Sequence, residues 1–276
     1  SVQILVGEYK NAPGHENWPH TDSFCAARQM TFDIARKNGA DWFFWADTDD
    51  ILSSGADLVR GLAESKPDLP CFIFPYEIFG RGVTVPRERM INAKAGGKWI
   101  YPVHECYQFP EFVDGGADER VVVQHMPKPS KTGSTERNLT ILESIPKEGM
   151  TAGLLYHLHC EQRAAGKVVE SVATAREALE HPELGTPERY ELLLNLAMMS
   201  KVPAVSNAYL LQAYAADPAR REALGMMACT AIDQGSPKNA LAIARQMLAT
   251  ERPNDWSWND RGAAYGWLGY DVMQQA

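Results

Sequence analysis

The sequence predicts an α/β region followed by an all-α region, and two observations carry that prediction. The apolar run at 42–45 ends abruptly in three carboxylates, Asp47, Asp49 and Asp50, which is typical of a buried strand that ends at the edge of a sheet. From about residue 135 onward, apolar residues recur with helical spacing instead. The sequence therefore predicts two domains, 1–135 and 136–276.

Composition places the protein among ordinary globular proteins. The chain has 276 residues, of which 45% are hydrophobic and 22% charged, and a net charge of -8, which argues against a surface built mainly to hold nucleic-acid backbone. No apolar run reaches the roughly 20 residues needed to span a bilayer. Five scattered cysteines without a CxxC pair predict a cytoplasmic protein. Both ends resemble cuts in a longer chain, because Ser1 leads straight into an apolar strand and Gln275 lies in a helical pattern.

The first domain alternates between strands and helices. In chain order we expect a strand at 2–6, a polar loop at 10–20, a helix at 24–38 that stops at Gly39, a strand at 42–46, the acidic turn, a short helix at 56–65, and strands at 71–76 and 120–125. A strand–helix–strand unit with acids at a strand's end favours a ligand crevice at that end of the sheet.

The second domain consists of helices only. We expect them at 136–144, 151–165, 167–180, 187–199, 203–216, 218–234 and 237–250. Thr186, Asp217 and Ser236 each precede a proline, which is typical of a capping residue before the first helical position. Short turns between such helices predict antiparallel pairs stacked like tetratricopeptide repeats (TPR). A plain helical bundle fits the spacing equally well.

The acidic turn is the first candidate site. Asp47-Thr48-Asp49 forms a D-x-D motif, which by itself is most often a helix cap or a solvated turn. Closely spaced carboxylates repel each other unless a cation or a proton neutralises them, and oxygen clusters suit Mg²⁺ or Mn²⁺. His125 ends a predicted strand; such a histidine is usually structural, although a neutral imidazole suits manganese.

Three further segments carry polar candidates. His104-Glu105 is either an incidental surface pair or a general base, Glu105, beside an orienting His104. The loop at 128–134, with Lys131, and the following Arg137 form either an interdomain linker or a segment that closes over a diphosphate. His157 and His159 lie two positions apart on a predicted helix and point about 200° apart, so we interpret them as ordinary helical residues rather than zinc ligands.

Four segments in this order resemble family 2 glycosyltransferases of the GT-A fold, of the soluble type with a TPR-like helical tail. They are Trp18 with the segment 22–28 (DSFCAAR), the strand and D-x-D motif at 42–52, the segment 99–105 (WIYPVHE), and His125 followed by Arg137-Asn138-Leu139.

The resemblance implies a metal-dependent hexosyltransferase-like enzyme that transfers a sugar from a nucleotide-sugar donor, by inversion in a single displacement. It implies a GT-A-like mixed sheet that lacks its first strands here. The implied metal ligands for Mn²⁺ or Mg²⁺ are Asp49, Asp47 and His125. The implied donor-binding residues, for a UDP-sugar, are Asp47, Arg28, Arg137 and Lys131. The implied catalytic residues are Glu105 and His104, acting on a peptide, a glycan or another hydroxyl or thiol acceptor.

Two other functions remain open. The missing first strands favour a non-catalytic scaffold, in which TPR-like helices bind a protein partner beside a degenerate GT-A remnant. A metal-dependent nucleotidyltransferase would share the acidic site but needs a phosphate loop near its first strand.

Overall fold

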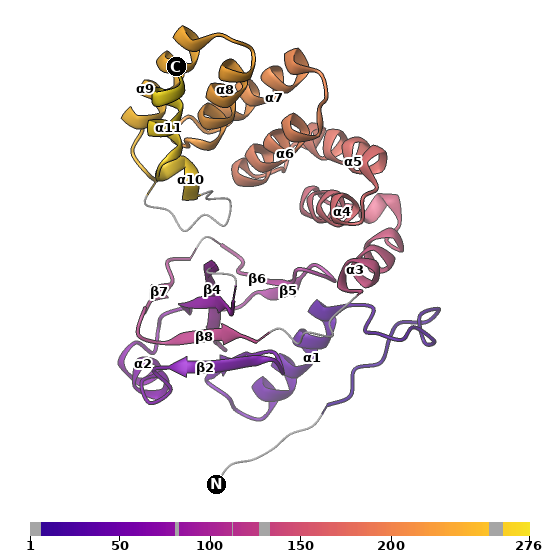
Figure 1. Ribbon diagram of the computed structural model, residues 1–276. Helices are drawn as coiled ribbons and strands as arrows, with labels where there is room; N and C mark the ends of the chain where they lie inside the picture. The colour runs from indigo at the N-terminus through magenta and orange to yellow at the C-terminus, as the bar shows by residue number, and fades with distance from the viewer. Residues whose placement is uncertain (1–6, 81–82, 112, 127–132, 254–261) are drawn as a thin grey trace. The chain divides into compact units, whose positions relative to one another are not determined.

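The chain folds into two compact units, Ser1–Ser144 and Ile145–Ala276, which are described separately. The computed structural model describes residues 7–80, 83–111, 113–126, 133–253 and 262–276 (Figure 1). The first unit contains a mixed sheet and the second contains helices, so the predicted order of an α/β region followed by an all-α region is confirmed. The chain divides after Ser144, whereas the sequence predicted a boundary at 135.

A six-stranded mixed sheet forms the first unit, in the order β1-β4-β3-β8-β2 with β7 beside β3. Its strands are β1 Trp42–Phe44, β2 Asp50–Ser54, β3 Cys71–Ile78, β4 Val83–Asn92, β7 Gly116–Ala117 and β8 Val122–His125. β3 runs parallel to β7 and β8, and the other pairs are antiparallel. A separate hairpin joins β5, Lys98–Ile100, to β6, Cys106–Gln108.

Helix α1, Phe24–Lys37, follows the prediction for 24–38 closely because both of its ends are encoded locally. The Ser23 side chain accepts a hydrogen bond from the Ala26 N–H at the start of the helix. Gly39 takes a φ of 81°, and its N–H and that of Ala40 close a Schellman turn on the carbonyls of Arg36 and Ala35. Helix α2 is shorter than the expected 56–65 and spans Val59–Ser65.

Two features of the sheet were not predicted. β1 and β2 are the two end strands of the order, so residues 45–49 cross from one edge of the sheet to the other. The longest strand, β4, was not predicted at all, because its arginines and glutamate interrupt the apolar pattern. The strand predicted at 2–6 lies outside the described residues.

The second unit is built from helix pairs. α4 and α5, α6 and α7, and α8 and α9 pack against one another in sequence. Their bounds are α4 Ala152–Ala164, α5 Val168–Glu180, α6 Thr186–Met199, α7 Pro203–Ala216, α8 Glu222–Asp233 and α9 Pro237–Ala249. α3, Ser134–Glu143, and the 3-10 turn Lys147–Gly149 precede them, and α10, Gly262–Tyr265, and α11, Leu268–Gln275, follow. No helix in the described ranges is both long enough and apolar enough to cross a membrane.

The three helix pairs share one repeat length and one pattern of buried positions. They begin at Ala152, Thr186 and Glu222, 34 and 36 residues apart, which matches the length of a TPR. Equivalent positions 34 or 35 residues apart are buried in all three pairs: Leu155, Tyr190 and Leu224 in the first helices, and Ala178, Ala213 and Met247 in the second helices. The helices therefore form a repeat rather than an unrelated bundle.

The turns within two pairs also repeat. Gly166 and Gly235 have φ angles of 74° and 66°, and each is followed by a residue whose N–H bonds to the carbonyl five residues earlier, so both turns are Schellman motifs. The predicted start at Asp217-Pro218 is wrong. The Asp217 carboxylate and carbonyl both bind Arg220 instead, which closes a turn before α8 begins at Glu222.

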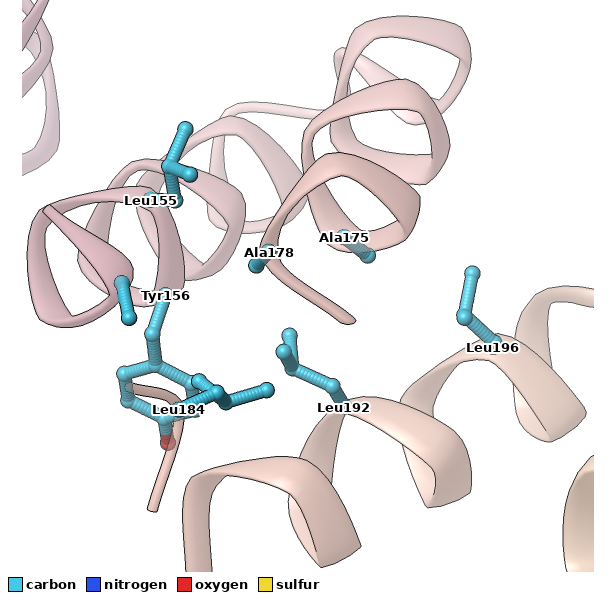
Figure 2. Close-up of a cluster of buried hydrophobic side chains, with 8 residues drawn as sticks. Leu155, Tyr156, Ala175, Ala178, Leu184, Leu192 and Leu196 are labelled. Carbon is cyan, nitrogen blue, oxygen red and sulfur yellow. The ribbon is translucent and has the colours of Figure 1, made fainter. Parts of the chain in front are cut away.

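The apolar core links successive pairs. Figure 2 shows the first cluster, in which side chains from α4, α5, α6 and the turn between α5 and α6 meet: Leu155, Tyr156, Ala175, Ala178, Leu184, Leu192 and Leu196. The first pair thus buries its apolar face only by contacting the second pair, as in stacked repeats.

Candidate functional site

The acidic turn is organised around Asp50, whose side chain is 1% exposed. One carboxylate oxygen accepts the Asp47 backbone N–H at 2.9 Å and lies 3.1 Å from Arg89 Nη1. The other accepts the Tyr76 hydroxyl at 3.0 Å and lies 3.2 Å from His125 Nδ1. Both oxygens of Asp50 are therefore fully engaged by the protein itself.

Arg89, which is as deeply buried as Asp50, provides the neutralising charge. Its guanidinium carbon lies 3.8 Å from the ring centroid of Trp45 and 4.1 Å from that of Tyr76. Burial lowers the pKa of Arg89, and Asp50 acts in the opposite direction. Burial and the neighbouring Asp50 raise the pKa of Tyr76, so the phenol stays a hydrogen-bond donor.

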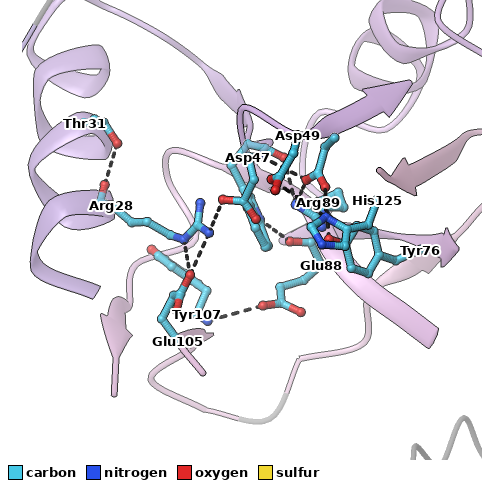
Figure 3. A network of polar contacts seen from close by, with 12 residues as sticks. Arg28, Thr31, Asp47, Asp49, Tyr76, Glu88, Arg89, Glu105, Tyr107 and His125 are labelled. Carbon is cyan, nitrogen blue, oxygen red and sulfur yellow. Dashed lines mark hydrogen bonds and ion pairs between the residues drawn. The ribbon is translucent and has the colours of Figure 1, made fainter. Parts of the chain in front are cut away.

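A second guanidinium, that of Arg28, holds the other half of the cluster (Figure 3). It donates from Nη2 to Asp47 at 2.6 Å and from Nε to Glu105 at 2.7 Å, and it stacks 4.4 Å from the Trp45 ring centroid. Burial lowers the pKa of Arg28, but Glu105 and Asp47 together outweigh burial and raise it. α1 and the β5–β6 hairpin are thereby fastened to the acidic turn.

The structure brings together a ligand set that differs from the predicted one. One ligand atom each from Asp49, Asp50 and His125 lies within 4.8 Å of the others. Asp47, predicted as a ligand, is instead paired with Arg28.

The other predicted residues lie around this cluster without forming one site. His104 is exposed and has a φ of 56°, in the left-handed region; Glu105 beside it binds Arg28. Arg137 stacks over the Phe24 ring at 4.6 Å and donates to the Asn138 side-chain carbonyl. Lys131 lies outside the described residues.

Sequence reasoning missed Arg89 and Tyr76, which do most to neutralise and orient Asp50. A signal was present for Tyr76 alone: it lies in the apolar run of β3, where a buried phenol needs a partner. Two of the three carboxylates, Asp47 and Asp50, are paired with the guanidinium groups of Arg28 and Arg89, which relieves much of the predicted repulsion.

The helical unit contains a second candidate site, a groove of about 360 Å³ between α7, α8 and α9. Its lining has no charged side chain: Asn207, Leu211, Met227, Ala231, Gln234, Ser236, Asn239, Ala242 and Ile243. A neighbouring groove formed by α5, α6 and α7 is charged, with Arg176, Glu177, Glu180 and Arg189 in its lining.

Four polar side chains converge on the uncharged groove. They are Asn207, Gln234, Ser236 and Asn239, and none has a side-chain hydrogen bond to another residue in the parts of the chain that the structure describes. Three amides and one hydroxyl therefore border an apolar floor, with donors and acceptors available to a ligand.

Comparison with known proteins gives no family assignment. No family model matches this chain, and no curated protein matches it.

The solved structures that resemble the chain include TPR proteins. One is YrrB, described as a TPR protein with an unusual peptide-binding site, at 15% identity and a TM-score of 0.40; the match covers 51% of this chain and just under two thirds, 66%, of YrrB. Another is MamA MSR-1 C2, at 15% identity, covering 52% of this chain and 82% of that protein with a TM-score of 0.38. A third is TTC0263, a thermophilic TPR protein in Thermus thermophilus, at 22% identity, covering 43% of this chain and 67% of that protein with a TM-score of 0.30.

The comparisons contradict the predicted membership of family 2 glycosyltransferases and, with it, the predicted enzyme: the solved structures found are described as TPR proteins. The GT-A fold itself gains no support; the coarser class, a sheet followed by TPR-like helices, stands. The motifs misled because Asp47, Asp50 and Glu105 form ion pairs with Arg28 and Arg89 here. The catalytic roles for His104 and Glu105 stay predictions.

Proposed function

We propose that the protein is an interaction scaffold, whose helical unit binds a peptide segment of a partner protein in the groove between α7, α8 and α9. The observation that carries this proposal is the uncharged lining of that groove, in a protein of which 22% of the residues are charged. Aqueous surfaces are normally mixed in charge, and depletion of charge is a mark of interface cores.

The helix beside the groove supports the same conclusion. α7 contains no charged residue from Pro203 to Ala216, although Leu211 is 58% exposed and Val205 is 41% exposed. An exposed apolar surface of this kind is expected at a protein contact.

The chemistry of the lining defines the partner. Amide side chains at Asn207, Gln234 and Asn239 can hydrogen-bond to the main chain of an extended peptide, and the apolar floor accepts its side chains. Met227 in that floor is flexible and polarisable and adapts to different shapes. The groove offers no counter-ion, so a charged side chain would lose hydration without compensation. The expected ligand is an extended, uncharged segment with apolar side chains.

Peptides selected from a displayed random library on the full-length chain are expected to be uncharged at the positions that enter the groove. Ala242→Glu places a carboxylate in the groove at an exposed site on α9. It should weaken binding of the selected peptides at least about tenfold, equivalent to about 1.4 kcal/mol, measured by isothermal titration calorimetry.

Ala215→Glu is the matched control, since Ala215 is also exposed but lies in the charged groove. It should leave binding unchanged. If the selected peptides lose affinity for Ala215→Glu but not for Ala242→Glu, their binding site is instead the charged groove formed by α5, α6 and α7. A library that yields no binder at all would contradict the scaffold.

A second candidate function is binding of a divalent cation, supported by the approach of Asp49, Asp50 and His125 within 4.8 Å. Two carboxylates and one imidazole suit Mn²⁺ or Mg²⁺, Mn²⁺ better because of the nitrogen ligand. Arg89 already compensates Asp50, so the cation would take its main contacts from Asp49 and His125.

Titration of the chain with Mn²⁺ alone should show one site whose affinity falls at least about tenfold in Asp49→Asn. Asp57→Asn, at an exposed acid outside the cluster, is the control and should leave the affinity unchanged. Equal Mn²⁺ binding by all three proteins would remove this candidate without affecting the peptide groove.

A further inference from the structure

A chain of buried polar groups crosses the junction between the first and second helix pairs. His159 of α4 and Asn195 of α6 are both 0% exposed, as is Ser171 of α5. His159 Nδ1 lies 3.0 Å from the Ser171 carbonyl oxygen and 2.9 Å from its hydroxyl, and Nε2 lies 3.3 Å from Asn195 Nδ2. Asn195 Oδ1 accepts a hydrogen bond from Arg163 at 2.8 Å.

These contacts fix one protonation state of His159. A carbonyl oxygen only accepts, so Nδ1 must carry the hydrogen that it donates to Ser171. Nε2 then has a free lone pair and accepts from the Asn195 amide. Arg163 only donates, so Asn195 must point its oxygen at Arg163 and its NH2 group at His159. All three groups are satisfied only when the imidazole is neutral.

We propose that His159, Asn195 and Arg163 form an acid-sensitive brace between the first and second helix pairs. Protonated at Nε2, His159 would present a hydrogen to the NH2 group of Asn195. Rotating the Asn195 amide would satisfy His159 but would turn the same NH2 group toward Arg163. Neither orientation satisfies both neighbours, so the contact between α4 and α6 is lost or strained.

The surrounding groups give the imidazolium no counter-charge. Burial and Arg163 lower the pKa of His159 and outweigh the hydrogen bond to the Ser171 carbonyl, which acts to raise it. The charged group that acts on His159 is Arg163, on its own helix, and it repels a second positive charge. α5 presents Ser171, which is uncharged, and α6 presents Asn195, also uncharged. The acids of α6 act on other groups: Glu188 and Glu191 act on Tyr156, and Glu191 also acts on Cys160.

The direction of the pH dependence follows from burial. Burial lowers the pKa of His159 below its usual value, and Arg163 lowers it further. Between the folded-state pKa and about 6.5, the ordinary value for histidine, the unfolded chain therefore binds more protons than the folded chain. Stability supplied by the neutral brace is complete above pH 6.5 and is lost as the pH falls below it.

The test uses the full chain and two variants. The NMR titration of His159, assigned by its absence in His159→Gln, should give a pKa below 6.5. Asn195→Asp places a carboxylate between Nε2 and Arg163, where it can accept from both, so the His159 pKa should rise above 6.5. The protection factors of the α4 and α6 amides, which compare the observed exchange rate with the intrinsic rate at the same pH, should fall between pH 7.5 and pH 5.5 in the wild type and much less in Asn195→Asp.

The proposal is overturned by a wild-type His159 that titrates at or above 6.5, or by equal acid sensitivity of α4 and α6 in the wild type and in Asn195→Asp. If His159→Gln fails to fold, the His159 resonance is assigned instead by its shift in Asn195→Asp, which keeps the histidine and a side chain of the same size, so both readouts remain decisive. The proposed peptide groove lies in other helices. A failure of the peptide-binding proposal would therefore not affect this result.

Discussion

Arg89→Met is expected to destabilise the sheet unit by about 3–5 kcal/mol, the usual cost of removing one partner from a buried ion pair. The substitution retains much of the packing between the Trp45 and Tyr76 rings but leaves Asp50, 1% exposed, without its cation. Hydrogen exchange of β3 and β4 amides, together with the fluorescence of Trp45 in urea unfolding, measures the loss.

A double variant distinguishes a charge effect from a packing effect. Arg89→Met combined with Asp50→Asn removes both charges and should be clearly more stable than the sum of the two single effects predicts. Arg120→Met is the surface control: its ion pair with Asp118 is 67% exposed on the arginine side, and the unfolding midpoint should not move. Additive single and double effects would contradict the role of Arg89 as the counter-charge.

Tyr190→Ala is expected to destabilise the helical unit by about 3–5 kcal/mol, since it opens a cavity in a packed core. Tyr190 is 0% exposed and lies in a cluster with Leu194, Leu210 and Ala223 that joins α6, α7 and α8. Its hydroxyl donates to Glu222 at 3.2 Å and accepts from the Ala223 N–H at 3.0 Å. The midpoint of thermal unfolding, followed by far-ultraviolet circular dichroism, reports the loss of helix.

Two variants calibrate this result. Tyr190→Phe keeps the ring and removes only the hydroxyl contacts, so a smaller loss of about 1–3 kcal/mol is expected. Leu211→Ala removes an exposed side chain from the adjacent helix and should change stability little. If Tyr190→Ala costs no more than Leu211→Ala, the repeat is not held together by the equivalent buried positions.

The helices were predictable because their determinants are local. Capping by Ser23, the left-handed turns at Gly166 and Gly235, and apolar spacing of about 3.6 residues lie within a few positions of the structure they specify. Strand β4 was not predictable in this way. Its Arg89 is accommodated by Asp50, Trp45 and Tyr76, which are distant in sequence.

The candidate sites likewise have some features that were predictable from the local sequence and others that depend on the folded chain. The sequence correctly indicated that the carboxylates at 47–50 need positive charge nearby, because like charges in close proximity repel in any fold. It could not say which cation supplies that charge. Arg28 comes from α1 and Arg89 from β4, and only the folded chain brings them to the acidic turn. The uncharged groove is assembled from three helices and leaves no local pattern.

By itself, the sequence determined the succession of an α/β region and a helical region, the positions of most helices, and the concentration of negative charge after Trp45. Tertiary structure decided that this charge is held by Arg28 and Arg89, that the helices repeat as stacked pairs, and that His159 is locked in its neutral form by Ser171 and Asn195. The physical reason is the distance along the sequence over which each kind of interaction acts. Backbone preference and periodicity act over a few residues, whereas neutralisation, burial and hydrogen-bond satisfaction depend on groups that folding brings together.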